Sequence, residues 1–215
     1  MDSLKKYIKD SYYYSALSVF AQWLISTFFL IFYYQVLHKT TVTFIGAKPD
    51  THKNYVVVSN HRSMKDPPLL GHAVRLPIAF IAKKELFKSA ALTAFMAATS
   101  TISVDRESAE IQTFKEAKRA LQSKPLGHAW SVGVFIEGTR STDPEHLGKP
   151  NKGPLFIARM AKVPIIPVGI SYRANKEIVV KVGKPYEIDY KGDLDKQAWE
   201  CLEKISQLTD YKMPE

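Results

Sequence analysis

Short apolar runs alternate with segments of helical periodicity along most of this chain, and this alternation restricts the possible fold more than any other feature. The runs are rich in Val, Ile and Thr, which favours strands. Strands that alternate with helices are typical of an open, largely parallel sheet with helices on its faces. We therefore predict an α/β fold with strands at Thr41–Ile45, Tyr55–Ser59, Ile78–Ala82, Ser100–Val104, Ser131–Ile136, Ile165–Ser171 and Ile178–Val182.

The segments with helical periodicity follow these strands. Ser108 and Asp195 are the expected N-caps of two of them, because their side-chain oxygens can accept from backbone N–H groups of a first turn. A chain of 215 residues is long enough to bury one sizeable core, so we predict a single α/β domain over residues 39–215. Its helices are expected at Pro67–Val74, Leu86–Ala98, Ser108–Ser123, Pro154–Ala161 and Asp195–Thr209.

The segment before this domain is apolar and uncharged. No charged residue occurs in the 27 positions from Ser11 to Leu37, and a bilayer core needs roughly 20 apolar residues to cross. The polar residues recur every three or four positions, which places them on one helical face: Ser11, Ser15, Ser18, Gln22 and Ser26. Three interpretations remain open: a spanning helix, a helix embedded in one leaflet, or a helix buried in a soluble core. We predict that residues 1–38 form a membrane-associating helix.

Charge is distributed unevenly along the chain. The net charge is +9, and residues 39–88 carry nine Lys and Arg against three acids, whereas residues 186–215 carry four against eight. A concentration of basic residues favours an anionic partner: phospholipid headgroups, a phosphorylated substrate, an acidic carrier protein or nucleic acid. The single cysteine, Cys201, excludes an internal disulfide and fits a reducing compartment. Nothing near it in sequence lowers its pKa, so we expect an inert thiol.

Ionisable residues follow three of the predicted strands directly. In open α/β sheets ligands bind outside the carboxyl ends of the strands, so these residues are expected to meet at one edge of the sheet. The residues after the second strand are Asn60, His61 and Asp66, those after the fourth are Asp105 and Arg106, and those after the fifth are Glu137, Gly138, Thr139 and Arg140. The ionisable ones are His61, Asp66, Asp105, Arg106, Glu137 and Arg140.

His61 and Asp66 form a possible base and its orienting carboxylate. A carboxylate that accepts from one imidazole nitrogen fixes the tautomer and leaves the other nitrogen able to take a proton. The spacing by itself is equally compatible with a structural role. The chain lacks the G-x-S-x-G elbow, the H-E-x-x-H pair, a Cys/His cluster and a Walker A loop. A base without an enzyme nucleophile most simply acts on a substrate hydroxyl, while Arg106 and Arg140 would hold an anionic group or form structural ion pairs.

Four blocks of the sequence carry a resemblance to a known family. They resemble, in order, the motifs of the glycerolipid acyltransferases, the family of 1-acylglycerol-3-phosphate O-acyltransferases, over about residues 42–185. The chain departs from the family pattern at Ala90 and Thr93, where Pro and Gly are usual, which bears on the choice of lysophospholipid. The blocks are Asn60-His61-Arg62-Ser63-Met64-Lys65-Asp66, Ala82–Leu86 with Val104-Asp105-Arg106, Phe135–Ser141 and Val163–Val168.

The resemblance implies an activity and a set of roles. A fatty acyl group would pass from acyl-CoA or acyl-carrier protein to the free hydroxyl of a lysophospholipid acceptor, giving phosphatidic acid, without a cofactor, a metal or nucleic acid. His61 would be the base and Asp66 its support. The acceptor site would consist of Glu137, Gly138, Thr139 and Arg140, with Arg106 as a second phosphate contact and Pro167 in the supporting wall.

The resemblance also implies a location and leaves alternatives. The protein would act at a membrane phospholipid surface, on the cytoplasmic face of a bacterial inner membrane or an equivalent organelle membrane. Three alternatives stay open: a relative that acylates another lysophospholipid, a catalytically idle lipid-binding relative, and a lipid hydrolase that uses water.

Overall fold

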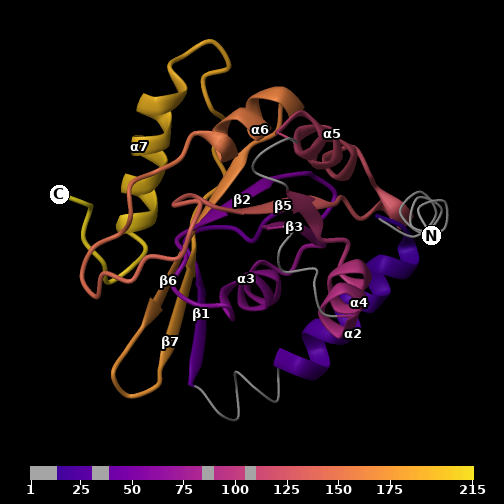
Figure 1. Ribbon diagram of the computed structural model, residues 1–215, viewed down its shortest axis with the longest axis horizontal. Coiled ribbons are helices and arrows are strands. Elements are labelled where there is room, and N and C mark those ends of the chain that lie inside the picture. The colour runs from indigo at the N-terminus through magenta and orange to yellow at the C-terminus, as the bar shows by residue number, and fades with distance from the viewer. Residues whose placement is uncertain (1–13, 31–38, 84–89, 105–109) are drawn as a thin grey trace.

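The computed structural model describes residues 14–30, 39–83, 90–104 and 110–215, which form a seven-stranded sheet with helices on both faces (Figure 1). The strand order is β1-β7-β6-β2-β5-β3-β4, and every neighbouring pair is parallel except β6 and β7. The predicted open, largely parallel α/β sheet is confirmed. The strands are β1 Thr40–Phe44, β2 Val56–Ser59, β3 Ile78–Lys83, β4 Ile102–Val104, β5 Ser131–Phe135, β6 Ile165–Tyr172 and β7 Ile178–Val182.

The inner strands β2 and β6 are buried on both faces, which explains their continuous apolar sequences. In β2, Val56 and Val58 belong to one core cluster and Val57 to the other, because successive side chains of a strand point to opposite faces. Helices α5, α6 and α7 cover the first face and α3 covers the second (Figure 1). The described helices are α2 Ala16–Leu30, α3 Asp66–Val74, α4 Ala90–Ala98, α5 Glu110–Leu121, α6 Gly153–Ala161, α7 Leu194–Ser206 and a 3₁₀ turn at Pro125–Gly127.

One of the two predicted helix caps is wrong. Helix α7 is capped by Asp193, whose side chain accepts from the backbone N–H of Lys196 at 3.0 Å. Asp193 has the extended backbone that an N-cap needs, whereas Asp195 already lies inside the first turn. The other predicted cap, Ser108, lies outside the described residues.

Helix α2 presents its polar side to the protein and its apolar side outward. Ser18 is fully buried, and the amide of Gln22 pairs with the backbone of Ile78 at the start of β3, donating to the carbonyl at 2.6 Å and accepting from the N–H at 2.8 Å. The residues on the outward side expose between 51% and 62% of their surface, so the interpretation as a helix buried in a soluble core is wrong for α2. They are Leu17, Phe20, Trp23 and Leu24.

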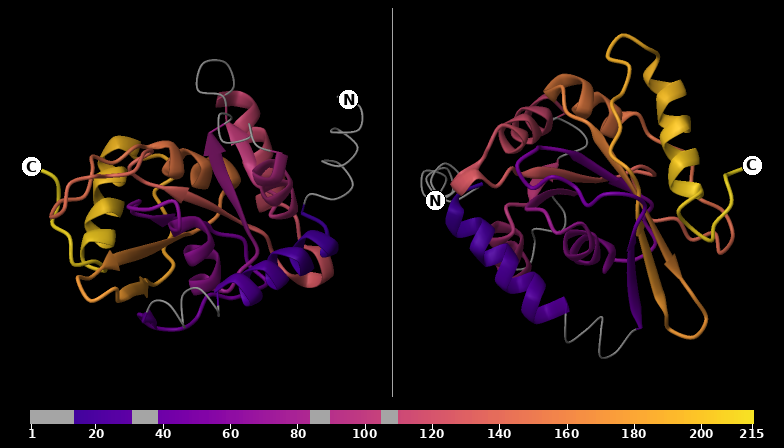
Figure 2. Two further views of the ribbon diagram at one scale, coloured as in Figure 1. Left: turned by 60° about the horizontal axis from the view of Figure 1, so that its bottom comes forward. Right: turned by 180° about the vertical axis from the view of Figure 1, so that it is seen from behind.

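Both views of Figure 2 show α2 along the outside of the molecule, on the side opposite α7. It packs against α3 and α4. Within the part of the chain that the structure describes, every helix is too short or too polar to cross a lipid bilayer.

Candidate active site

The candidate site lies at the carboxyl ends of β2, β5 and β6, three neighbouring parallel strands. Asn60 follows β2 directly and is fully buried. Its side-chain amide donates to the carbonyl of Ile170 in β6 and accepts from the N–H of the same residue, both at 2.9 Å. This pair of bonds continues the β2–β6 contact beyond the last strand residue, and the chain then turns out of the sheet at His61.

His61 and Asp66 are in direct contact, as predicted from the sequence. Nδ1 of His61 lies 2.8 Å from Oδ2 of Asp66, which stands at the first position of α3. A carboxylate only accepts hydrogen bonds, so Nδ1 carries the proton and Nε2 is the nitrogen that can accept one. The imidazole is therefore in the tautomer that a general base requires.

The carboxylate of Asp66 is fully buried, and hydrogen-bond donors surround it. Besides His61, Oδ2 accepts from the backbone N–H groups of Arg62 at 2.6 Å and Ser63 at 2.7 Å. Oδ1 accepts from the hydroxyl of Tyr172 at 2.5 Å. An ionised carboxylate would be very unfavourable in a buried position without such donors. The four bonds satisfy the buried carboxylate and align it with the imidazole.

Three further contacts hold His61. Its backbone N–H donates to Oε1 of Glu137 at 2.9 Å, and its carbonyl accepts from the N–H of Ser141 at 2.9 Å. The imidazole stacks on the ring of Phe135, with ring centroids 4.0 Å apart and planes 13° apart. Both the backbone and the ring of His61 are thus fixed by the end of β5 and the loop that follows.

Glu137 joins His61 to the loop after β5. While Oε1 accepts from His61, Oε2 accepts from the backbone N–H of Gly148 at 3.0 Å. Burial raises the pKa of Glu137, and the two amide donors partly offset this. A Cβ at position 148 would lie 2.8 Å from Oε2, so only glycine allows this approach. The structure places the Glu137 carboxylate behind the site, on backbone amides.

A cavity of about 1210 Å³ opens beside His61. His61, Gly138, Thr139 and Arg140 line it together, so the predicted base and the predicted acceptor-binding turn share one space. Gly138 has a φ of +66°, a left-handed conformation that glycine adopts without strain. The rest of the wall is largely apolar and comes from α2, α3, β3 and α4, including Trp23, Phe80 and Met96.

The remaining predicted site residues lie elsewhere. Pro167 is in the middle of β6, where it is paired with Val58 of β2. It is therefore part of the sheet that carries the site. Arg106 lies outside the described residues.

Two residues that bind Asp66 were not assigned a role from the sequence. Tyr172, the last residue of β6, binds Asp66 from 106 positions away. The guanidinium of Arg62 donates to the carbonyls of Asp143 and His146, and its Cζ lies 3.8 Å from the ring centroid of Tyr211. Tyr172 directly follows the predicted strand Ile165–Ser171, so the strand-end argument that found His61 would have indicated it.

Comparison with known proteins agrees with this geometry. The family model described as Acyltransferase matches residues 39–171. An uncharacterised acyltransferase of Schizosaccharomyces pombe is 36% identical over 122 residues, 55% of this chain and 42% of that protein. The 1-acyl-sn-glycerol-3-phosphate acyltransferase of Saccharomyces cerevisiae is 32% identical over 140 residues, 60% of this chain and 43% of that protein. The Bacillus subtilis protein of the same name is 29% identical over 132 residues, 60% and 62% of the two chains.

The matched region spans less than two thirds of the length of each of these relatives. A crystal structure of the 1-acyl-sn-glycerophosphate acyltransferase from Thermotoga maritima superposes with a TM-score of 0.65 at 24% identity, over 86% of this chain and 77% of that one, and so shares the fold. The family match covers more than half of the residues and includes His61, Asp66 and Arg140. By this match the chain belongs to the Acyltransferase family.

Proposed function

We propose that this protein transfers a fatty acyl group from an acyl thioester, acyl-CoA or acyl-carrier protein, to the free hydroxyl of 1-acylglycerol-3-phosphate. The product is phosphatidic acid. The observation that carries the proposal is the His61–Asp66 contact of 2.8 Å in the wall of a cavity that Arg140 also lines. Relatives named as 1-acyl-sn-glycerol-3-phosphate acyltransferases support the choice of acceptor.

The reaction needs one base and no enzyme nucleophile. Nε2 of His61 takes the proton of the acceptor hydroxyl as the oxygen attacks the thioester carbonyl carbon. The new C–O bond forms, the tetrahedral intermediate collapses, the C–S bond breaks, and the thiolate leaves with the proton that His61 holds. Asp66 stabilises the imidazolium between these steps. Base catalysis of this kind contributes about 10²–10⁴-fold, and alignment of the two bound substrates supplies more.

The acceptor is recognised through its phosphate. Arg140 is exposed and lines the cavity, and a guanidinium binds phosphate through two parallel hydrogen bonds. Gly138 and Thr139 belong to the same turn and contribute to the same wall. The volume of about 1210 Å³ exceeds the range of roughly 300–1000 Å³ usual for small-molecule pockets, which suits lipid substrates.

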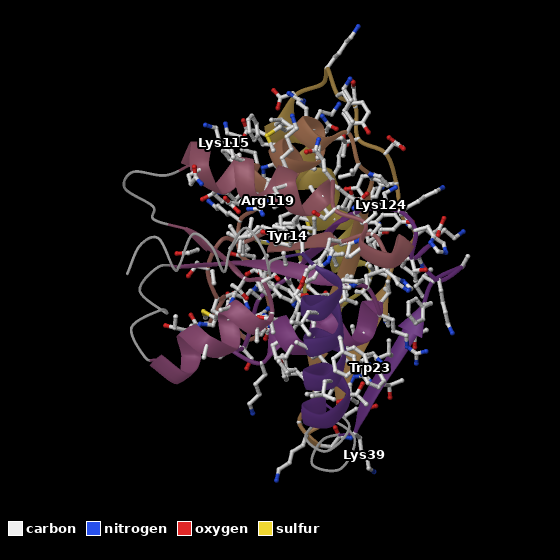
Figure 3. The ribbon with its side chains drawn as sticks, turned by 90° about the vertical axis from the view of Figure 1, so that its right-hand side faces the viewer. Tyr14, Trp23, Lys39, Lys115, Arg119 and Lys124 are labelled. Atoms are coloured by element: carbon white, nitrogen blue, oxygen red, sulfur yellow. The ribbon has the colours of Figure 1, made fainter. Side chains whose placement is uncertain are left out.

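The protein works at a membrane surface in this proposal, because the acceptor and the product are lipids. The outward apolar side of α2 supports that location, since a helix that turns its polar side to its own protein leaves the apolar side for lipid. Lys115, Arg119 and Lys124 lie toward one end of α2 and Lys39 toward the other (Figure 3). Basic residues around an apolar patch favour the anionic cytoplasmic leaflet.

The decisive experiment measures free thiol released by the purified full-length chain in phospholipid vesicles. Each donor, acyl-CoA or acyl-carrier protein, is combined with 1-acylglycerol-3-phosphate, with another lysophospholipid, or with no acceptor. Thiol release that requires 1-acylglycerol-3-phosphate and forms phosphatidic acid is the expected result. Thiol release without an acceptor would identify a hydrolase. A preference for another lysophospholipid would change the assigned acceptor. Absence of thiol release with every pair of substrates would indicate a lipid-binding protein without this activity.

A further inference from the structure

The two oxygens of the Asp66 carboxylate differ in the number and origin of their hydrogen-bond donors. Oδ2 accepts from three donors, His61, Arg62 and Ser63, all of which lie within five positions of Asp66. Oδ1 accepts from Tyr172, which a different part of the chain contributes. Local sequence therefore supplies one half of the carboxylate's environment, and β6 supplies the other half.

The parallel arrangement of the sheet explains how Tyr172 reaches this position. β6 lies beside β2 and runs parallel to it, so the last residue of β6 emerges at the same edge as His61. The backbone N–H of Tyr172 donates to the hydroxyl of Tyr211 at 3.2 Å, and the antiparallel pair Tyr172–Ile178 fixes its backbone in register with β7. The backbone of Tyr172 is thus held by the sheet and by the segment after α7.

The bond to Oδ1 restricts rotation of the carboxylate. The terminal torsion of an aspartate side chain is broad, so one oxygen by itself does not fix the plane of the group. Asp66 has a relative exposure of 0%, and water is therefore a poor substitute donor at Oδ1. With the Tyr172 hydroxyl in place, Oδ2 points at Nδ1 of His61; without it, a buried acceptor is unsatisfied and the carboxylate plane is free to turn.

We propose that Tyr172 is a positioning residue of the His61–Asp66 pair, acting through Asp66 on the orientation of the imidazole. The inference rests on the proposed acyl transfer. The hydroxyl satisfies Oδ1 and thereby aligns Oδ2 with Nδ1. Removing it misaligns the pair and lowers turnover.

The test compares Tyr172→Phe and Tyr172→Leu with Tyr190→Phe in the acyl-transfer assay. Tyr190 is a matched control, because its hydroxyl also donates to a carboxylate, Glu187, at 2.6 Å, but does so away from the cavity. Both substitutions at Tyr172 are expected to lower kcat about tenfold with the KM values of donor and acceptor unchanged, whereas Tyr190→Phe leaves kcat unchanged. Thermal unfolding of each variant establishes that the chain is folded.

The split between kcat and KM separates positioning from a general loosening of the structure. A misaligned His61–Asp66 pair lowers kcat and leaves both KM values unchanged. A loosened site also raises the KM values and lowers the midpoint of thermal unfolding.

The outcomes distinguish this inference from the function on which it rests. Acyl transfer by the unmodified chain together with wild-type kcat in Tyr172→Phe overturns the positioning role alone. A raised KM with unchanged kcat also overturns it and reassigns Tyr172 to substrate binding. Absence of transfer by the unmodified chain overturns both proposals.

Discussion

The carboxylate of Glu137, two positions after β5, accepts a hydrogen bond from the backbone N–H of His61 at 2.9 Å and so holds His61 in place after β2. The parallel pairing of β2 and β5 brings the two sequence blocks together, and Glu137 then joins them. Its second oxygen extends the connection to Gly148. Glu137 therefore has a structural role in the site, and its position in the sequence block does not indicate this role.

This relationship predicts the effect of Gly148→Ala. The new Cβ would lie 2.8 Å from Oε2 of Glu137 and push the carboxylate away from both amides. We expect kcat to fall by about tenfold or more, because small displacements of a base reduce rates steeply. Gly71→Ala is the stability control: its Cβ lies 3.8 Å from Phe80 inside α3, so it is expected to raise the free energy of unfolding by about 0.5–1 kcal/mol. An unchanged kcat in Gly148→Ala would show that Glu137 does not position His61.

Removal of the imidazole tests the general base. His61→Ala is expected to lower kcat by about 10²–10⁴-fold while the thermal unfolding midpoint changes little, because the ring is partly exposed to the cavity. The control is His52→Ala, since His52 is exposed and its ring contacts the carbonyl of Gly127. Near-normal turnover in His61→Ala would remove the base from the mechanism.

Arg140→Ala tests recognition of the acceptor phosphate. We expect KM for 1-acylglycerol-3-phosphate to rise about 10- to 100-fold, the usual effect of losing a charge-assisted pair, with a smaller change in kcat. Monoacylglycerol provides the control substrate, because it lacks the phosphate and should be acylated equally poorly by both proteins. An unchanged KM for the phosphorylated acceptor would assign Arg140 a structural role.

Trp23→Ser tests the outward side of α2. Burying a large apolar side chain in lipid contributes about 1.5–3 kcal/mol, so we expect at least about tenfold weaker binding to anionic phospholipid vesicles in a sedimentation assay. Trp199→Ser is the matched control, because Trp199 is also exposed but lies on α7, on the opposite side of the molecule (Figure 2). Equal losses in the two variants, or none, would contradict docking through α2.

The thiol of Cys201 is expected not to react with the reagent that measures released thiol. Burial raises the pKa of Cys201 from its ordinary value of 9.0 to about 11. The native protein should therefore not react with a disulfide reagent at neutral pH, while the urea-unfolded chain titrates one thiol. The raised pKa also means that the folded state keeps its proton where the unfolded state loses it, so stability falls as pH rises from about 9 to about 11. Rapid labelling of the native chain would show that Cys201 is accessible.

Much of the fold was predictable because its signals are local. Each of the seven strands lies within two residues of its predicted range, since β-branched runs between turn residues carry their own signal. The cap of α7 was misplaced by two positions, because Asp193 and Asp195 are equivalent candidates until the backbone conformation distinguishes them. The periodic polar face of α2 was also visible in the sequence.

The sequence by itself determined the order of the strands along the chain, the placing of His61 and Asp66 after β2, and the arginine after β5. Only the tertiary structure decided that the polar side of α2 faces the protein, that Glu137 binds backbone amides, and that Tyr172 completes the environment of Asp66. The physical reason is the range of the interactions. Hydrophobic periodicity and short spacings act between neighbours in sequence, whereas these hydrogen bonds join residues that only the parallel register of β2, β5 and β6 and the packing of α2 bring within reach.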